Sequence, residues 1–165
     1  MPTTAGNVSQ KVLARAKAVP ILRKLPVFEG LQEAELLKLM SACSSKAVEK
    51  GDEIFKQGED GSSMYILLAG MVDIVVEGVG VVHIMKPGEI LGEMGLVCKI
   101  TRTASAVAKE KSVLLHLYAD ILHELVKKNP NIGYIMMKNI AGILAQRIIG
   151  SNQKAAPAPE KKSRR

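Results

Sequence analysis

The stretch from residue 88 to 105, GEILGEMGLVCKITRTAS, brings one glutamate and one arginine into an otherwise apolar part of the chain. Gly92 and Gly95 let backbone N–H groups converge on an anion, and Arg102 adds a permanent, forked cation suited to a phosphate. Glu93 would repel that phosphate, so it is better suited to accept hydrogen bonds from a ribose hydroxyl pair. These residues favour a small nucleotide with one phosphate charge. A Glu93–Arg102 ion pair that braces the loop accounts for the same two charges.

The rest of the chain predicts strands between helices. Helical spacing indicates helices at 9–18, at 32–43, at 119–129 and at 131–149. Turn signals separate about eight short apolar runs, at 47–50, 53–57, 63–70, 71–76, 81–85, 89–91, 103–110 and 112–118. The expected fold class is therefore α+β, mainly β. Its expected form is an eight-stranded jelly-roll β-barrel flanked by an N-terminal helical segment and two C-terminal helices.

Length and composition suit one domain, because the chain has 165 residues and is 47% hydrophobic. We expect an N-terminal helical extension at 1–19, the domain at 20–150 and a disordered basic tail at 151–165. Residues 154–165 hold five basic residues and one acidic residue, so four of the seven net positive charges lie there. This placement argues against direct DNA binding. No apolar run is long enough for a leader or a membrane span, which favours a cytoplasmic protein.

The stretch resembles the phosphate-binding cassette of cyclic nucleotide-binding domains, such as those of the catabolite activator type and of protein kinase A regulatory subunits. LPVFEGLQEAELLKLM and GDEIFKQGEDGSSMYILLAGMVDI are similar to the family's leading helix and early strands, so the resemblance covers roughly residues 20–149. It implies that Arg102 binds the cyclic phosphate and that Glu93 takes the ribose 2′-hydroxyl. The cassette backbone would help at Gly92, Met94 and Gly95. The resemblance also implies a purine pocket lined by Ile74, His83, Met85 and Leu91.

Three positions qualify the resemblance. Leu91 stands where the family usually has an aromatic residue, and Thr101 stands where a proline commonly precedes the arginine. Thr103 lies beside the arginine and can hydrogen-bond a guanine, so both cAMP and cGMP stay open, with cAMP favoured as the commoner ligand. His83 lies between two apolar residues and is expected inside the pocket or at its rim.

In this family the last helix covers the base. Its apolar arc would act as a lid through Ile140, Ile143 and Leu144, and Arg147 projects into the same arc, where a cation needs a partner. Arg147 either contacts the purine or extends its charge from the helix end into solvent. If it contacts the purine, Arg147→Ala weakens binding by roughly 1–2 kcal/mol. Further apolar positions widen the arc and predict a homodimer through this helix: Met137, Ala141 and Ala145.

The sequence disfavours other functions. It shows no nucleophile–base set, no metal-ligand cluster and no helix-turn-helix after the long helix. We therefore expect a stand-alone, non-enzymatic sensor that binds cAMP or cGMP and needs no cofactor or metal. Movement of its C-terminal helix would signal to an unidentified effector protein. The alternative is a constitutive protein-interaction adaptor whose nucleotide pocket is vestigial.

Overall fold

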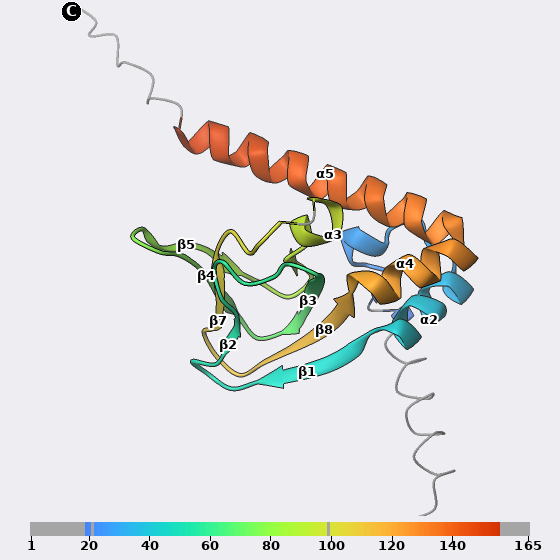
Figure 1. Ribbon diagram of the computed structural model, residues 1–165, viewed down its shortest axis with the longest axis horizontal. Helices are drawn as coiled ribbons and strands as arrows, with labels where there is room; N and C mark the ends of the chain where they lie inside the picture. The colour runs from blue at the N-terminus through green and yellow to red at the C-terminus, as the bar shows by residue number, and fades with distance from the viewer. Residues whose placement is uncertain (1–18, 21, 99, 156–165) are drawn as a thin grey trace, which may run out of the picture.

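Two four-stranded sheets form the centre of the molecule, and helices lie on one side of them (Figure 1). The computed structural model describes residues 19–20, 22–98 and 100–155; the helix expected at 9–18 and the tail beyond residue 155 lie outside them. The strands are β1 (Ser44–Val48), β2 (Glu53–Phe55), β3 (Ser63–Ala69), β4 (Val72–Val76), β5 (Gly80–Met85), β6 (Ile90–Leu91), β7 (Ser105–Ala108) and β8 (Ser112–Tyr118). The helices are η1 (Pro26–Phe28), α2 (Glu33–Ala42), α3 (Met94–Cys98), α4 (Ala119–Lys128) and α5 (Pro130–Ala155).

The eight expected strands are confirmed, with the first beginning three residues earlier than expected. One sheet has the order β1-β8-β3-β6 and the other β2-β7-β4-β5, and every pair is antiparallel. The expected closure into one barrel is not shown, because no strand of one sheet pairs with a strand of the other in the described ranges. The sheets meet through side chains instead, in a core that includes Tyr65 and Leu114 from one sheet and Val72 and Ala106 from the other.

Strand β3 is apolar on both faces because it lies between two cores. Tyr65 and Leu67 face the core between the sheets, whereas Met64 and Ile66 face a second core under the helices. Successive side chains of a strand point to opposite faces, so a strand covered on both sides has no polar alternation. The helical core includes Phe28, Leu36, Leu39, Ile132, Met136 and Ile140.

Helix α5 is anchored along its first half. Asn131 donates to the Glu35 carboxylate of α2 at 2.7 Å, and Asn139 donates to the backbone carbonyls of Val27 and Glu29 at 3.1 and 2.9 Å. The Asn131 hydrogen bond is the main reason that the pKa of Glu35 is lowered. These contacts tie α5 to η1 and α2.

The same helix is longer than expected, because it starts at Pro130 and continues to Ala155. Proline suits the first position of a helix, and no glycine or proline interrupts residues 151–155. The first five residues of the expected disordered tail are therefore helical. Among the described helices, none has the length and apolarity needed to cross a membrane.

Candidate phosphate and ribose site

Gly92 and Arg102 fit together in one close contact. Gly92 follows strand β6 with a φ of +75°, a conformation that favours glycine. A Cβ at this position would collide with Nη1 of Arg102, and that same Nη1 donates to the Gly92 carbonyl oxygen at 3.0 Å. The glycine is therefore required both for the turn and for the guanidinium beside it.

Helix α3 rests directly on the loop before β3. A Cβ on Gly95 would collide with the carbonyl oxygen of Gly61, and a Cβ on Gly61 would collide with the carbonyl oxygen of Ile100. The N–H of Gly95 already donates to the Gly92 carbonyl at 3.2 Å. Gly95 is therefore needed because it has no side chain, and its N–H makes a hydrogen bond within the turn.

Arg102 is buried, with 6% of its surface exposed. Its backbone is held on both sides, by Arg102 N–H to Glu59 C=O at 2.8 Å and by Gly58 N–H to Arg102 C=O at 2.9 Å. Thr101, which replaces the expected proline, forms an isolated bridge with Asp60. The turn is therefore held by backbone contacts without a proline.

The guanidinium of Arg102 makes only neutral contacts in the described part of the chain. Nη2 donates to the Ser63 hydroxyl at 3.0 Å, and Cζ lies 4.3 Å from the centre of the Phe55 ring. Nε is buried and has no hydrogen-bond partner. Burial lowers the pKa of Arg102, but a guanidinium stays protonated in proteins. A buried positive charge with an unused N–H donor therefore faces this site.

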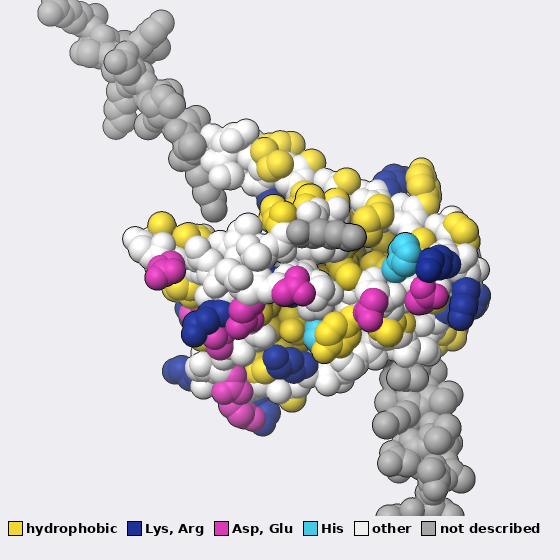
Figure 2. Space-filling model, in the orientation of Figure 1, with side chains coloured by type: hydrophobic (Ala, Val, Ile, Leu, Met, Phe, Trp, Pro, Cys, Tyr) yellow, Lys and Arg dark blue, Asp and Glu magenta, His cyan; other side chains and the backbone are white. Residues whose placement is uncertain are grey.

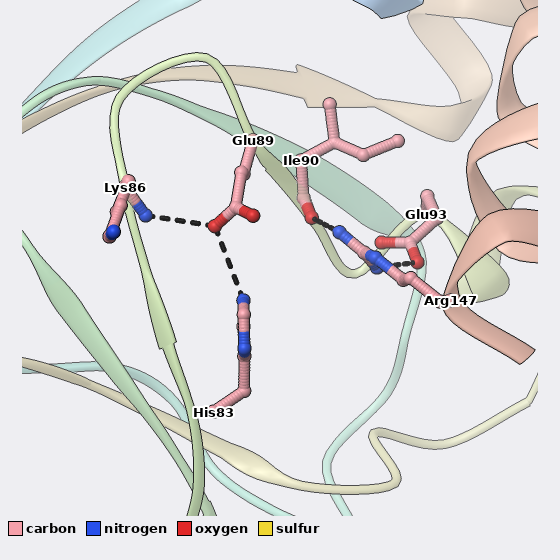
Figure 3. Close-up of polar contacts among 6 residues, drawn as sticks. All are labelled: His83, Lys86, Glu89, Ile90, Glu93 and Arg147. Carbon is pink, nitrogen blue, oxygen red and sulfur yellow. Dashed lines mark hydrogen bonds and ion pairs between the residues drawn. The ribbon is translucent and has the colours of Figure 1, made fainter. Parts of the chain in front are cut away.

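Glu93 pairs with the last helix and not with Arg102. Its side chain is only 4% exposed, and Arg147 of α5 donates Nη1 to Glu93 Oε1 at 2.5 Å and Nη2 to the Ile90 carbonyl at 2.6 Å (Figure 3). The loop-bracing Glu93–Arg102 ion pair is absent from the ion pairs of the described residues. The sequence predicted that the Arg147 charge needs a partner, and that partner is the Glu93 carboxylate. Arg147 therefore needs neither solvent nor a purine base to balance its charge.

These residues surround one cavity of about 510 Å³, a size typical of small-molecule sites. All ten residues expected for the phosphate, the ribose and the base line it: Ile74, His83, Met85, Leu91, Gly92, Glu93, Met94, Gly95, Arg102 and Thr103. Arg102 and the Glu93–Arg147 pair line the cavity together with Glu89, and of the two arginines only Arg102 lacks an ion-pair partner among the described residues. No cluster of three or more His, Cys, Asp or Glu side chains in the described ranges is placed to hold a metal ion.

Only one of the four expected lid residues lines this cavity. Arg147 lines it. Gly150 and Ser151 of α5 line it too, although the sequence predicted them as the last residue of the domain and the first residue of the tail. Ile140, Ile143 and Leu144 pack on the helical core instead. The apolar arc of α5 is therefore used to dock the helix rather than to cover the cavity.

His83 lies at the cavity rim, as one of the two expected positions. It is exposed, and its Nε2 lies 3.3 Å from Oε2 of Glu89, which also accepts the backbone N–H of Lys86 at 2.8 Å (Figure 3). A carboxylate therefore orients this ring beside the opening.

Sequence reasoning missed Phe55 and Ser63, which both contact the Arg102 guanidinium. Each left a weak signal. Phe55 is one of two phenylalanines in the chain, and Ser63 is a hydroxyl at the start of a strongly apolar run. Neither signal says which residue it contacts, because the contacts join segments about 40 residues or more apart.

The sequence is similar to those of known proteins. The family model described as cyclic nucleotide-binding domain matches residues 45–129. The chain is 32% identical over 127 residues to the cyclic AMP receptor protein of Thermus thermophilus, covering 74% of this chain and 57% of that protein. It is 30% identical over 97 residues to human cGMP-dependent protein kinase 2, covering 56% of this chain and 13% of the kinase.

The fold is also that of a solved structure. A cyclic nucleotide-binding domain from Methylobacillus flagellatus superposes with a TM-score of 0.76 at 21% identity, covering 89% of this chain and 86% of that one. The chain spans less than two thirds of the length of the two curated relatives above. With the family model matching more than half of its residues, the chain belongs to the cyclic nucleotide-binding domain family.

Proposed function

We propose that this chain is a cytoplasmic sensor that binds a 3′,5′-cyclic nucleotide and does not transform it. The buried Arg102 guanidinium carries this proposal, because the residue lines the cavity and its buried Nε–H has no hydrogen-bond partner. Burying an unpaired cation is costly unless an anion completes the site. A cyclic phosphate brings one negative charge, which would pair with the Arg102 guanidinium.

The remaining groups suit the other parts of such a ligand. The Glu93 carboxylate that now binds Arg147 can accept the ribose 2′-hydroxyl instead, and Gly92 and Met94 would bring the backbone close to the phosphate. Ile74, Met85 and Leu91 offer an apolar surface for a purine, with His83 at the rim. The likeness to the Thermus cyclic AMP receptor protein supports cAMP, and the likeness to a cGMP-dependent kinase supports testing cGMP as well.

Calorimetry with cAMP and with cGMP tests nucleotide binding directly. We expect micromolar or tighter binding of at least one of them, and at least a hundredfold loss in Arg102→Leu, because charge-assisted phosphate contacts are strong. Arg23→Leu is the matched control, since Arg23 is exposed and does not line the cavity. Absence of heat with both nucleotides would overturn the proposal.

Base choice has its own test at Thr103. This exposed residue lines the cavity beside Arg102. If its hydroxyl binds a guanine, Thr103→Ala weakens cGMP binding about tenfold and leaves cAMP binding unchanged. Equal losses for both nucleotides would mean that Thr103 does not read the base.

Signalling would proceed through α5. Arg147 holds the carboxylate that the ribose needs, so a bound nucleotide competes with Arg147 and loosens the end of the helix. An effector protein would read that change. We expect a partner captured on the immobilised protein with cyclic nucleotide to be lost without it, and to be lost in Arg102→Glu in either condition.

One observation favours the alternative, a constitutive adaptor with a vestigial pocket. Glu93 is already satisfied by Arg147, so the cavity has one ready partner fewer for a ligand. An adaptor would keep its partner in Arg102→Glu and without nucleotide. The capture experiment above therefore separates the two functions.

We also propose that α5 forms a homodimer. A residue at every seventh position can form one edge of a coiled-coil seam, and α5 exposes such residues at Tyr134, Ala141 and Ile148, with Met137 and Leu144 between them at the edge of the helical core. Tyr134 is 68% exposed and Ile148 61% exposed, and hydrophobic side chains are visible along this helix in Figure 2. A second copy of the same helix carries the same repeat, so the two helices can pack against each other along these residues.

Sedimentation tests the dimer. We expect a concentration-dependent dimer that Ile148→Glu abolishes, because a charge in the seam would be buried without a partner. Lys138→Glu, on the exposed surface of the same helix, should leave it intact. A monomer at every concentration would rule the dimer out.

A further inference from the structure

A row of four rings runs from Arg102 into the space between the sheets and ends at Tyr118, which is exposed and tilted by 48° against His116. It consists of Phe55, Tyr65, His116 and Tyr118, and we call it the ring stack. Its successive ring centres are 5.8, 4.2 and 4.1 Å apart. The Tyr65 and His116 rings are nearly parallel, at 8°. The chain has only two phenylalanines, three tyrosines and no tryptophan, so three of its five aromatic residues are gathered here.

The ring stack joins the two sheets beneath the candidate phosphate site. Phe55 comes from β2 of one sheet, whereas Tyr65 and His116 come from β3 and β8 of the other. Arg102 lies on the Phe55 end, and its guanidinium carbon is 4.3 Å from the ring centre. Because no carboxylate pairs with Arg102 in the described residues, the negative face of this ring is what the cation rests on.

His116 belongs to the ring stack as a neutral ring. It is 8% exposed, and its Nε2 is buried without a partner. The charged and titratable groups around it are Lys46 on β1, Tyr65 on β3, Tyr118 on its own strand and Arg102. Burial lowers the pKa of His116, and the charges of Lys46 and Arg102 lower it further. Burial also raises the pKa of Tyr65, so both central rings are uncharged at neutral pH.

We propose that the ring stack is a positioning element that fixes the Arg102 guanidinium for an anionic ligand, and that it requires an aromatic ring at position 116. The ligand in question is the cyclic phosphate of the proposed function, on which this inference rests. Phe55 supports the guanidinium directly, and Tyr65, His116 and Tyr118 hold the Phe55 ring from behind. An aliphatic side chain at position 55 or 116 would fill the space without presenting a flat face.

The first measurement needs no nucleotide. Nitrogen NMR of the ligand-free protein follows the Arg102 Nε–H, which is buried and should exchange slowly with solvent. We expect a sharp resonance in the wild type and in His116→Phe, which keeps a ring. We expect exchange broadening in Phe55→Leu and His116→Leu. Phe28→Leu is the control, because Phe28 is a buried ring in the helical core, outside the stack.

The second measurement is nucleotide affinity by calorimetry. Loss of the ring should weaken binding about five- to tenfold in Phe55→Leu, the size of a desolvated cation–π contact, and about threefold to fivefold in His116→Leu. His116→Phe and Phe28→Leu should keep wild-type affinity. Rescue by phenylalanine distinguishes a stacked ring from a histidine that acts through hydrogen bonds.

A pH profile reports on His116 alone. A bound phosphate offsets the Arg102 charge, so binding raises the pKa of His116, and by linkage affinity increases as pH falls through the bound-state pKa of His116. His83 is a second histidine at the cavity rim, so the profile is measured in His83→Gln. We expect binding about two- to threefold tighter at pH 5.5 than at pH 7.5, and no change in the double variant His83→Gln/His116→Phe.

The outcomes separate the two proposals. A wild type that binds neither nucleotide overturns the proposed function, while the NMR of the ligand-free protein still decides the role of the ring stack. A wild type that binds, together with Phe55→Leu and His116→Leu variants that match Phe28→Leu in affinity and exchange, overturns the ring stack. A pH profile that is the same in His83→Gln and in His83→Gln/His116→Phe would mean that His116 is not part of the ring stack.

Discussion

The two arginines of the cavity are held in opposite ways. Arg102 is buried, its backbone is tied on both sides, and glycines at 61, 92 and 95 leave no room for it or for α3 to shift. Arg147 stands on the second half of α5, beyond the Asn139 contacts, and reaches the cavity through one ion pair and one carbonyl (Figure 3). One wall of the cavity is therefore fixed by close packing, and the other is held by contacts that a ligand can replace.

This difference assigns separate roles to two residues of the same type. A fixed cation gives affinity without the cost of ordering it on binding. A cation held by a replaceable pair lets binding change a helix. The four predictions below probe first the fixed wall and then the movable one.

Gly95→Ala should have the largest effect, because its Cβ would collide with a backbone carbonyl that has no room to move. We expect a loss of about 2–4 kcal/mol in the free energy of unfolding, typical of severe overpacking, measured by chemical denaturation. Gly142→Ala is the control on α5, where a Cβ meets nothing within 4 Å. It should gain about 0.5–1 kcal/mol. Similar values for the two variants would contradict a tightly packed wall.

Gly92→Ala should displace the Arg102 guanidinium. We expect nucleotide affinity to fall at least thirtyfold in calorimetry, with a loss of about 1–2 kcal/mol in stability from the positive φ. Gly78→Ala carries the same backbone strain, since its φ is +76°, but has nothing within 4 Å of its Cβ. If Gly78→Ala weakened binding equally, the collision with Arg102 would not be the cause.

Arg147→Ala tests the movable wall, and the structure reverses the sign expected from the sequence. A purine contact would weaken binding by roughly 1–2 kcal/mol, whereas removal of a competitor for Glu93 should strengthen it about two- to fivefold, as for a partly exposed ion pair. Calorimetry of Arg147→Ala, with Lys138→Ala as the control, measures the change in nucleotide affinity. Weaker binding in Arg147→Ala would instead support a contact between Arg147 and the purine.

Glu35→Gln should have the smallest effect and concerns the anchored half of α5. The folded-state pKa of Glu35 is lowered, so its contribution is present above the unfolded pKa near 4.3 and is lost as pH falls through the folded pKa. The group is exposed, so we expect no more than about 0.5 kcal/mol at pH 7. Glu33→Gln in the same helical turn is the control. A difference between them that persists at pH 2 would not come from this carboxylate.

The sequence predicted the features that depend on neighbouring residues. Strands follow from the spacing of apolar residues, and the cassette follows from glycines and charges within fifteen residues, so both are visible without coordinates. The residues lining the cavity were found through the same stretch and the resemblance it carries.

Features that depend on distant contacts were not predicted. A helical projection placed Arg147 in an apolar arc but did not identify Glu93, which lies 54 residues earlier. It also did not show that Ile140, Ile143 and Leu144 face the helical core. The ring stack combines three strands from two sheets, and no periodicity in one segment reports such a meeting.

The anchoring of α5 at Asn139 has a mechanical consequence. A helix rises about 1.5 Å per residue, so Arg147 lies about 12 Å beyond that fulcrum and Ala155 about 24 Å beyond it. If the helix pivots there as a rigid rod, any displacement at the ion pair is doubled at the far end. The helix is then a lever whose short arm touches the ligand site, and a reporter dye attached near residue 153 would magnify a small motion into a measurable one.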